Sequence, residues 1–467
     1  MPYTPRPYRF TGEVRRTLLL AAPIVAGQLS SVLMTFVDTV LAGRHGATTL
    51  AGVAVGSAVW SVVILVLVGV LMAVPPSSCD TDGAGRHERI GPLFRQAVWL
   101  ALALGVFLFG MVSLSGPLLA GMGIADDVRP AAQDFLAAIR WGAPALALFF
   151  CARYLSEGLA WTLPTMVAGL LGVAALFPLG HALMFGDGPL PALGAAGLGY
   201  ATAFVLWVQA LGLLAYLRWS RRFAGLHLFA RWDAPHPGEI LSLLKLGLPI
   251  GVAVFMEGSL FVTTALLIGR MGATAVGAHQ VAINVASLAF MVPLGVAMAT
   301  TVRIGQAAGR LDGAGVRAAA RAGYGIVLGT QLLTAAVMVV AGHAIAGIYT
   351  DDPAIAALAG GLLLFAAAFQ FPDGIQALSS GALRGLKDTA WPMVITALAY
   401  WGLGMPLGAY LGLELGLGMG PRGMWIGLIA GLSAAAVLMT WRFLRLARRL
   451  PETEPLLPVT GPGQPSA

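Results

Sequence analysis

The stretch LLLAAPIVAGQLSSVLMTFVDTVLA, residues Leu18–Ala42, is an almost unbroken run of apolar and small side chains that contains one acid, Asp38. At 1.5 Å per residue, a helix of this length crosses the hydrocarbon core of a bilayer, which is about 30 Å thick. Similar stretches recur along the chain, for example at Thr49–Val74 and Ala97–Leu119. About twelve such stretches fit the sequence. We therefore expect a polytopic membrane protein.

The composition favours helices over a membrane barrel. Of the 467 residues, 58% are hydrophobic and 10% are charged, whereas soluble globular chains carry about 25% charged residues. The apolar stretches are rich in Gly, Ala and Leu, which suits close helix packing, and they lack the alternation of an outer-membrane barrel. The first stretch is too long for a signal-peptide core, so we expect it to be retained. The sequence thus predicts an all-α membrane protein with twelve transmembrane helices.

Arginine and lysine are distributed unevenly over the loops of this twelve-helix arrangement. Most lie on the side that carries both ends of the chain, in the N-terminal residues, in 86–95, 218–245 and 303–321, in the loop with Arg384 and Lys387, and in 442–449. The opposite side keeps mainly Arg44, Arg129, Arg270 and Arg422. Because cytoplasmic loops carry the excess of positive charge, we expect both termini in the cytoplasm of a bacterial inner-membrane protein. The net charge of +7 then reflects topology and indicates no nucleic-acid partner.

The chain repeats itself after six helices. The motif Gly43–Thr48 (GRHGAT) recurs as Gly269–Thr274 (GRMGAT). Three prolines, Pro144, Pro164 and Pro178, recur at one constant spacing as Pro372, Pro392 and Pro406. Since six is an even number, both halves share one orientation, which predicts two parallel six-helix bundles. This architecture is typical of transporters with a site between the bundles, although channels and receptors are also built from duplicated bundles.

These features predict five regions. They are a cytoplasmic N-terminal segment (1–16), an N-lobe of helices 1–6 (17–218), a cytoplasmic inter-lobe linker (219–241), a C-lobe of helices 7–12 (242–450) and a disordered cytoplasmic tail (451–467). The tail is rich in proline and poor in apolar residues, which is typical of disordered segments. The GRHGAT and GRMGAT motifs are expected to be turns at the outer membrane boundary.

Three acids lie inside the apolar stretches. Asp38 lies near the outer end of helix 1, Glu257 lies in helix 7 ~18 Å from Lys245, and Asp373 lies in helix 10 ~16 Å before Arg384. Insertion scales put a central acidic residue at about 2.5–3.5 kcal/mol, and no lysine or arginine is expected at this depth in these helices. A carboxylate without a fixed counter-charge must take a proton, a sodium ion or a cationic substrate. The alternative is a protonated carboxyl hydrogen-bonded to a neighbouring helix.

Helix 8 carries a polar stripe formed by Gln280, Asn284 and Ser287, with His279 beside it. Helical spacing places these side chains on one face, where they either line a cavity or hold the bundle together by hydrogen bonds. Pro372, next to Asp373, frees a backbone carbonyl that can kink the helix or coordinate a cation.

Sequence signatures of catalysis and of ATP binding are absent. There is no GxxxxGK[ST], GxSxG or HExxH motif, and the two cysteines, Cys79 and Cys151, form no metal-ligand pattern. We therefore expect neither an enzyme nor a cofactor, apart from a coupling ion. Transport by such a chain must be secondary, that is, driven by an ion gradient. We expect the protein to be monomeric.

Several segments together make the chain resemble the multidrug and toxic compound extrusion (MATE) family, in its bacterial NorM-type branch. They are FVDTVLAGR (36–44), WGAP (141–144), GAAGLGYAT (194–202), FME (255–257), AHQVAIN (278–284), QFPD (370–373) and GALRGLKD (381–388). The resemblance implies two six-helix lobes that form a V around a large cavity. It also implies roles for the three acids. Glu257 and Asp373 form the cation site of the C-lobe, where they are the ligands of the metal ion if the coupling ion is sodium. Asp38 is the proton or substrate site of the N-lobe.

The chain departs from the family pattern at three places. Segment 74–82 (VPPSSCDTD) stands where a Thr-Pro pair followed by Ala-Gln is usual. Leu176 and Gly180 stand in helix 5 where asparagines are common, which leaves fewer polar groups around Asp38. Phe369 occupies a position where a tyrosine is common, four residues before Asp373.

The working hypothesis is a multidrug efflux transporter that exchanges organic, mostly cationic and lipophilic compounds for sodium or protons by alternating access. Its partners would be small-molecule drugs and membrane lipids. The alternatives are a flippase for a lipid-linked precursor, a non-coupled channel and a non-transporting receptor. A flippase is expected to need several basic residues in its cavity, and none are expected in these helices.

Overall fold

The computed structural model describes residues 8–121, 125–186, 191–414 and 416–451, and nearly all of them are helical. Within these ranges, twelve helical spans are long and apolar enough to cross a membrane. The fold class predicted from the sequence is confirmed. The sixth span ends at Trp219 and the seventh begins at Pro237, so residues 220–236 join the two halves. The tail expected to be disordered, 451–467, lies outside the described residues from 452 onward, as do residues 1–7 of the expected N-terminal segment.

The first six spans form the N-lobe. They are α1 (Phe10–His45), α2 (Ala47–Leu71) with α3 (Val74–Gly83), α4 (Ile90–Ser113), α6 (Arg129–Ile139) with α7 (Ala143–Gly158), α8 (Leu163–Phe185) and α9 (Gly194–Trp219). Short elements join them: η1 (His87–Arg89), α5 (Ser115–Gly121), η2 (Arg140–Gly142) and η3 (Ala224–Leu226).

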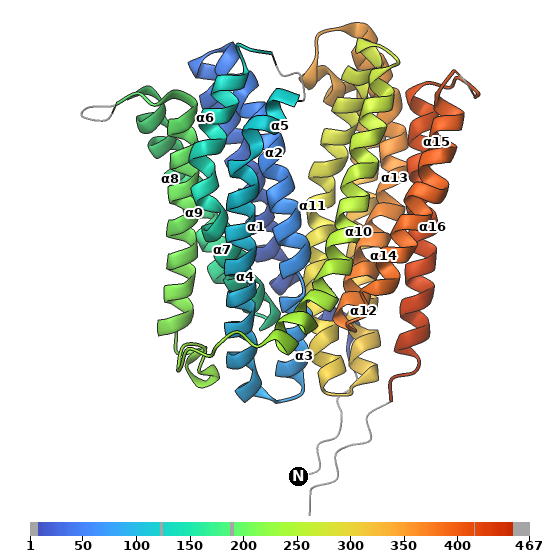
Figure 1. Cartoon of the computed structure of the whole chain (residues 1–467). Coiled ribbons are helices and arrows are strands. Elements are labelled where there is room, and N and C mark those ends of the chain that lie inside the picture. Colours follow the sequence, from blue (N-terminus) through green and yellow to red (C-terminus); the bar gives the residue numbers. More distant parts are fainter. Residues whose placement is uncertain (1–7, 122–124, 187–190, 415, 452–467) are drawn as a thin grey trace, which may run out of the picture.

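The last six spans form the C-lobe. They are α10 (Pro237–Gly269), α11 (Ala273–Gly309), α12 (Gly313–Tyr349), α13 (Pro353–Gly385), α14 (Ala390–Thr396) with η4 (Ala397–Gly404) and α15 (Met405–Gly412), and α16 (Pro421–Ala447). The η4 segment is a π-helix. Figure 1 shows the N-lobe on the left and the C-lobe on the right.

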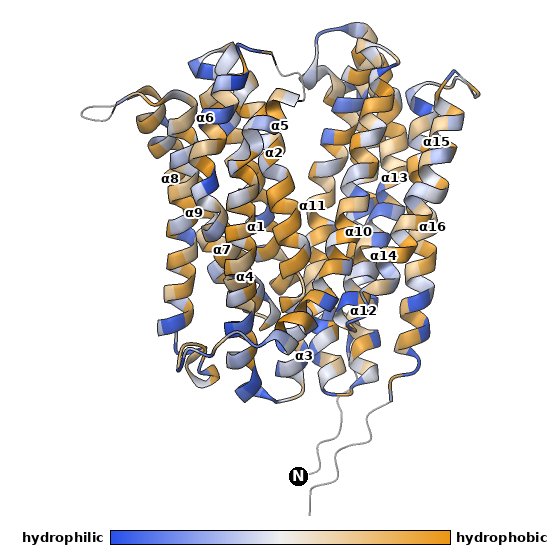
Figure 2. Cartoon of the chain, viewed as in Figure 1, coloured by the Kyte–Doolittle hydropathy of each residue, from blue (hydrophilic) through white to orange (hydrophobic). Residues whose placement is uncertain are grey.

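Helix α1 begins and α16 ends at the same face of the molecule, the lower face in Figure 1, which we call the terminal face. The opposite face is the far face. Apolar residues cover the middle of the spans, whereas hydrophilic residues gather at the helix ends and in the loops of the terminal face (Figure 2). This distribution matches a bilayer that surrounds the middle of both lobes.

The internal repeat reappears in the backbone. Helix α1 ends at His45 and α2 begins at Ala47, with Gly46 between them at φ 151°. At the equivalent place in the C-lobe, Gly272 precedes α11 at φ 101°. A positive φ is easily adopted only by glycine. The two GR-x-GAT motifs are therefore tight turns between consecutive spans, as expected.

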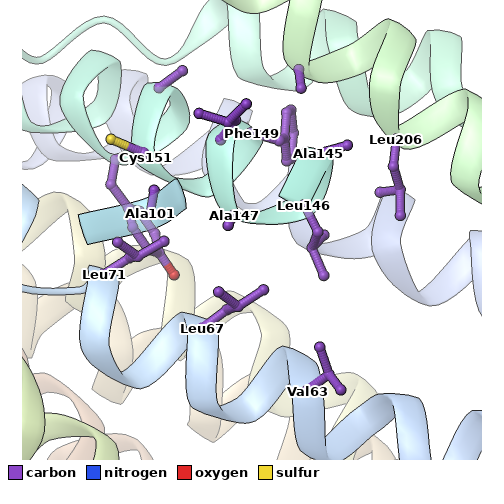
Figure 3. Close-up of a cluster of buried hydrophobic side chains, with 14 of the residues drawn as sticks. Val63, Leu67, Leu71, Ala101, Ala145, Leu146, Ala147, Phe149, Cys151 and Leu206 are labelled. Carbon is purple, nitrogen blue, oxygen red and sulfur yellow. The ribbon is translucent and has the colours of Figure 1, made fainter. Parts of the chain in front are cut away.

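Buried apolar side chains pack the spans of each lobe together. In the N-lobe, Leu67 of α2, Ala101 of α4, Ala147 of α7 and Leu206 of α9 belong to one buried apolar cluster (Figure 3). In the C-lobe, a second cluster centres on the fully buried Trp425 of α16. Since lipid gives helices no hydrophobic drive to associate, such close packing supplies much of their attraction.

The lobes touch each other along a seam in the half of the molecule toward the terminal face, where α11 packs against α1 and α3, and α2 packs against α10. A Cβ added to Gly69 of α2 would lie 2.3 Å from the Cα of Gly251 in α10. A Cβ added to Gly305 of α11 would lie 2.1 Å from the sulfur of Cys79 in α3. Glycine at both places is therefore required for this closed seam.

Polar pairs join the lobes at the terminal end of the seam. Lys387 Nζ donates to Asp80 Oδ2 at 2.5 Å, and Gln306 Nε2 donates to Asp82 Oδ2 at 2.9 Å. An ion pair also joins Arg303 to Glu13. In the two ion pairs the N-lobe supplies the acid and the C-lobe the base. The unusual segment 74–82 thus supplies two of the acids that hold the lobes together.

The residue that precedes α1 adds one more link across the seam. The hydroxyl of Tyr8 donates a hydrogen bond to a carboxylate oxygen of Asp312 in the loop between α11 and α12. Partial burial and the neighbouring Asp312 carboxylate raise the pKa of the Tyr8 phenol to about 12. Tyr8 therefore remains a hydrogen-bond donor at neutral pH.

Replacing Gly69 with leucine should separate the lobes at the seam. Cys79 is fully buried there, so its thiol reports on seam opening in a Cys151→Ser background. We expect a small maleimide to label Cys79 at least about tenfold faster in Gly69→Leu, because about 1.4 kcal/mol changes a two-state population tenfold. The matched control is Gly110→Leu in α4, where a Cβ would meet no atom within 4 Å. Equal labelling rates in the Cys151→Ser protein and in its Gly69→Leu and Gly110→Leu variants would contradict the close packing of the lobes at Gly69.

Candidate functional site

A cavity of about 400 Å³ lies between the lobes and is lined by side chains from both. Its walls are largely apolar and include aromatic residues such as Trp60, Phe149, Phe150 and Phe290. Of the residues that the structure describes, four charged side chains line it: Asp38, Arg153, Glu257 and Arg384. The cavity is thus an apolar chamber with separate acidic and basic groups.

Asp38 is the acidic group of the N-lobe wall. It lies in α1, and its side chain is largely buried. Thr202 of α9 donates a hydrogen bond to Asp38 Oδ1 at 3.3 Å. The nearby positions in α8 contribute no polar group: Leu176 is fully buried, and Gly180 lies against Leu41 and Leu198. Asp38 therefore has one neutral hydrogen-bond donor and no basic partner among the described residues.

Glu257 and Asp373 belong to the C-lobe and lie close enough to interact electrostatically. Glu257 of α10 lines the cavity, whereas Asp373 of α13 is buried, with 3% of its surface exposed. Neither carboxylate forms a hydrogen bond or an ion pair with any residue in the described ranges. The two acids expected to share one depth in the membrane are thus neighbours, and of the two only Glu257 lines the cavity.

Tyr400 is a further polar group beside these acids that the sequence analysis missed. It is fully buried in the π-helix η4, and it interacts electrostatically with both Glu257 and Asp373. Its hydroxyl has no hydrogen-bond partner within the described part of the chain. Phe369 lacks a hydroxyl and packs edge-on against Phe261 and Trp425. π-Helical segments inside α-helices are frequent at functional sites. The sequence gives little signal for Tyr400, because Tyr410 lies in the same apolar span.

The polar stripe of α11 does not reach the cavity. Gln280, Asn284 and Ser287 are exposed and are absent from its lining. Gln280 Nε2 donates to Asn284 Oδ1 at 3.0 Å, which satisfies part of their hydrogen-bonding capacity within the helix. His279 is buried and packs edge-on against Trp425.

The structure corrects the expectation that basic residues are absent from the interior. Arg384 was assigned to a loop, but it lies in the last turn of α13, with 8% of its surface exposed, and lines the cavity. Arg153 of α7 also lines it, and pairs with the buried Glu157 at 2.7 Å. Glu157 is likewise an acid inside a span that the sequence analysis had not counted. The argument that the cavity lacks basic residues is therefore wrong.

This arrangement suits the binding of monovalent cations and of organic amines. Neither carboxylate has an ion-pair partner in the described residues, although Arg384 acts on Glu257 electrostatically. With a free hydroxyl beside them, the two acids offer oxygen ligands to a proton, a sodium ion or an ammonium group. Within the described ranges, no three histidine, cysteine or acidic side chains cluster as a transition-metal site would require. The apolar and aromatic walls are typical of sites for drug-sized molecules.

Comparison with known proteins places these features in a family. The MatE family profile matches residues 23–180 and again 249–410, once in each lobe. A probable multidrug resistance protein NorM from Xanthomonas campestris pv. campestris is 57% identical over 442 residues, which cover 95% of this chain and 96% of the relative. The multidrug resistance protein PmpM from Pseudomonas aeruginosa is 40% identical over 448 residues, with 95% and 94% covered.

Solved structures show the same fold at lower identity. A MATE protein crystallised in a bent conformation superimposes with a TM-score of 0.86 at 18% identity, covering 95% of this chain and 99% of that one. A multidrug resistance MATE family transporter of the MOP superfamily in an outward-facing conformation gives a TM-score of 0.85 at 20% identity, with 94% and 97% covered.

Breaking the buried ion pair of α7 should destabilise the protein. Removing one partner of a buried pair costs about 3–5 kcal/mol, since the other charge is left uncompensated. We expect Glu157→Gln to lower the Tm of the detergent-purified protein clearly, and the double change Arg153→Met with Glu157→Met to recover most of the loss. Asp126→Asn, which removes an ion pair whose acid is 92% exposed, should have little effect. A Tm unchanged by Glu157→Gln would refute a structural role for the pair.

Proposed function

Because this chain belongs to the MatE family, in its NorM-type bacterial branch, we propose that it is a multidrug efflux transporter which exchanges organic, mostly cationic and lipophilic compounds for sodium or protons by alternating access. The observation that carries the coupling is the pair of adjacent C-lobe carboxylates, Glu257 and Asp373, which have no counter-charge bound to them in the described residues. A membrane protein that keeps such groups inside hydrocarbon must neutralise them with a ligand.

The protein is a multi-pass protein of the bacterial inner membrane, and we place its terminal face in the cytoplasm. Exposed basic residues at this face include Arg86, Arg89, Arg221 and Arg231. Such an excess of positive charge is typical of cytoplasmic loops. With this orientation the seam closes the cytoplasmic side, so the conformation described here is closed toward the cytoplasm.

The C-lobe acids are assigned to the coupling ion. Entry of sodium or a proton from outside neutralises the pair formed by Glu257 and Asp373, and lowers the affinity of the cavity for a cationic compound. Asp38 in the N-lobe is assigned as a second proton or substrate site. Export is driven only if ion and drug prefer different states or compete for one site, because coupling is a difference in binding free energy.

The remaining assignments follow from this function. The chain acts as a transporter and not as an enzyme, and needs no bound cofactor besides the coupling ion. It works as a monomer, because each chain contains both lobes and the cavity between them. Its substrates reach the cavity from the cytoplasm or the membrane when the seam is open.

Neutralising either C-lobe acid should abolish coupling. In proteoliposomes with an imposed sodium or proton gradient, we expect Glu257→Gln and Asp373→Asn to reduce gradient-driven transport of an organic cation at least about tenfold, since a coupling free energy of about 1.4 kcal/mol corresponds to a factor of ten. The control is Asp351→Asn, which alters an exposed acid outside the spans. Transport at the wild-type rate by both variants would contradict the site assignment.

The same vesicles separate the alternative functions. A non-coupled channel would move the organic cation without any counter-flux of sodium or protons. A flippase would move a lipid-linked precursor and leave the cation where it is. Exchange of cation for ion, abolished in the two variants and retained in Asp351→Asn, supports the exporter.

A further inference from the structure

Arg384 is a charged group at the cavity whose position neither the proposed coupling nor an ion-pair partner among the described residues explains. It lies in the last turn of α13, and 8% of its surface is exposed, so that it is more than nine-tenths buried. Its side chain lines the cavity together with Met72 of α2. At 1.5 Å per residue it lies ~16 Å along α13 from Asp373, toward the terminal face. It therefore lies at the end of the cavity nearer the terminal face, which we call the inner end.

The guanidinium of Arg384 has almost no partner in the protein. A guanidinium carries five N–H donors and stays charged in proteins. Its one hydrogen bond within the described residues runs from Nη1 to the sulfur of Met72 at 3.8 Å, and sulfur is a weak acceptor. Its Nε is buried without any partner among these residues. Glu257 and Tyr154 act on it electrostatically, but no described carboxylate lies within 4 Å of it.

The second arginine of the cavity provides the contrast. Arg153 donates from Nε to Glu157 at 2.7 Å and from Nη2 to Gln28 at 3.2 Å. Its charge is thus compensated by a buried acid. Both arginines line the same cavity, but Arg384 has no carboxylate partner among the described residues and its Nε has no hydrogen-bond partner there. A buried, unpaired cation is costly unless a ligand completes it.

We propose that Arg384 is an anion-binding subsite, which holds a carboxylate of zwitterionic aromatic substrates while their amine faces the acidic side of the cavity. The inference rests on the proposed function, because it assumes that substrates occupy this cavity. A planar guanidinium with free donors is well matched to a carboxylate, which it can bind through two parallel hydrogen bonds. The apolar and aromatic walls then hold the body of the substrate.

The positions of the charges also define which molecules fit. Asp38 and Glu257 supply negative charge from the two lobes, and Arg384 supplies positive charge at the inner end. A substrate with a cationic amine and an anionic carboxylate at opposite ends complements this pattern. A purely cationic substrate uses only the acidic groups and leaves Arg384 unsatisfied. The cavity should therefore bind the zwitterion more tightly than a cation of the same size and shape.

The test uses two forms of one dye: a cationic rhodamine methyl ester and its free acid, which is zwitterionic at neutral pH. Fluorescence polarisation with the full chain in phosphatidylcholine nanodiscs measures the Kd of each. We expect Arg384→Gln to weaken binding of the free acid about tenfold or more and to change binding of the ester less than about twofold, as expected for the loss of a charge-assisted hydrogen bond. Arg384→Lys, which keeps the charge, should recover part of the loss.

The control is Arg270→Gln, which removes an exposed arginine at the far face and should change neither Kd. Equal weakening of ester and acid in Arg384→Gln would overturn the subsite and indicate a structural role for Arg384. Unchanged binding of the acid would overturn it as well. Failure of the wild-type protein to bind even the ester would instead refute the cavity as the substrate site, and with it the proposed function.

One further arm distinguishes the substrate from a lipid. If anionic phosphatidylglycerol in the nanodiscs blocks binding of the free acid to the wild-type protein but leaves binding of the ester intact, a lipid headgroup occupies Arg384 and the substrate subsite is refuted. If the acid binds equally in both lipid compositions, the substrate carboxylate is the ligand.

Discussion

The function of this structure depends on buried charged side chains that form no ion pair and lie in or beside the cavity between the two lobes. In hydrocarbon or in an apolar cavity, an isolated charge costs several kcal/mol. Four charged side chains that form no ion pair within the described residues, namely Asp38, Glu257, Asp373 and Arg384, lie in or beside one cavity. The charges that serve stability are instead paired, as Arg153 and Glu157 are in α7. Buried charged residues that form ion pairs thus serve stability, whereas those that form none are assigned to function.

The seam between the lobes is built so that it can open. Its apolar part consists of glycine and small side chains, such as Gly69 against Gly251, which give close contact over little buried area per residue. Its polar part lies at the terminal face, where the ion pair of Lys387 with Asp80 is partly accessible to water. An exposed pair of this kind contributes little net stability because solvent competes for it. The ion pair of Arg303 with Glu13 is instead largely buried, so both charges must regain water or new partners when the seam opens. This pair is therefore the contact that alternating access must break at the greatest cost.

Much of this fold follows from local patterns, and the rest depends on packing. The spans, the parallel repeat and the position of Glu257 and Asp373 inside spans could be predicted because helix length and apolar content determine them. Arg384 could not be placed correctly, since an arginine three residues before Lys387 looks the same in sequence whether the helix ends before or after it. The role of Tyr400 depends on a π-helical turn in a distant span, and that turn has no clear signal in the sequence.

The division between Glu257 and Asp373 explains how one ion can control the cavity. Glu257 lines the chamber, whereas Asp373 is buried beside it and is absent from the lining. In the proposed cycle, an ion bound between them can be retained by Asp373 while it neutralises the charge that Glu257 presents to a substrate. A cationic compound can reach only the first of the two acids. Ion and drug therefore compete through Glu257 without needing the same set of ligands, and the ion has the more protected site.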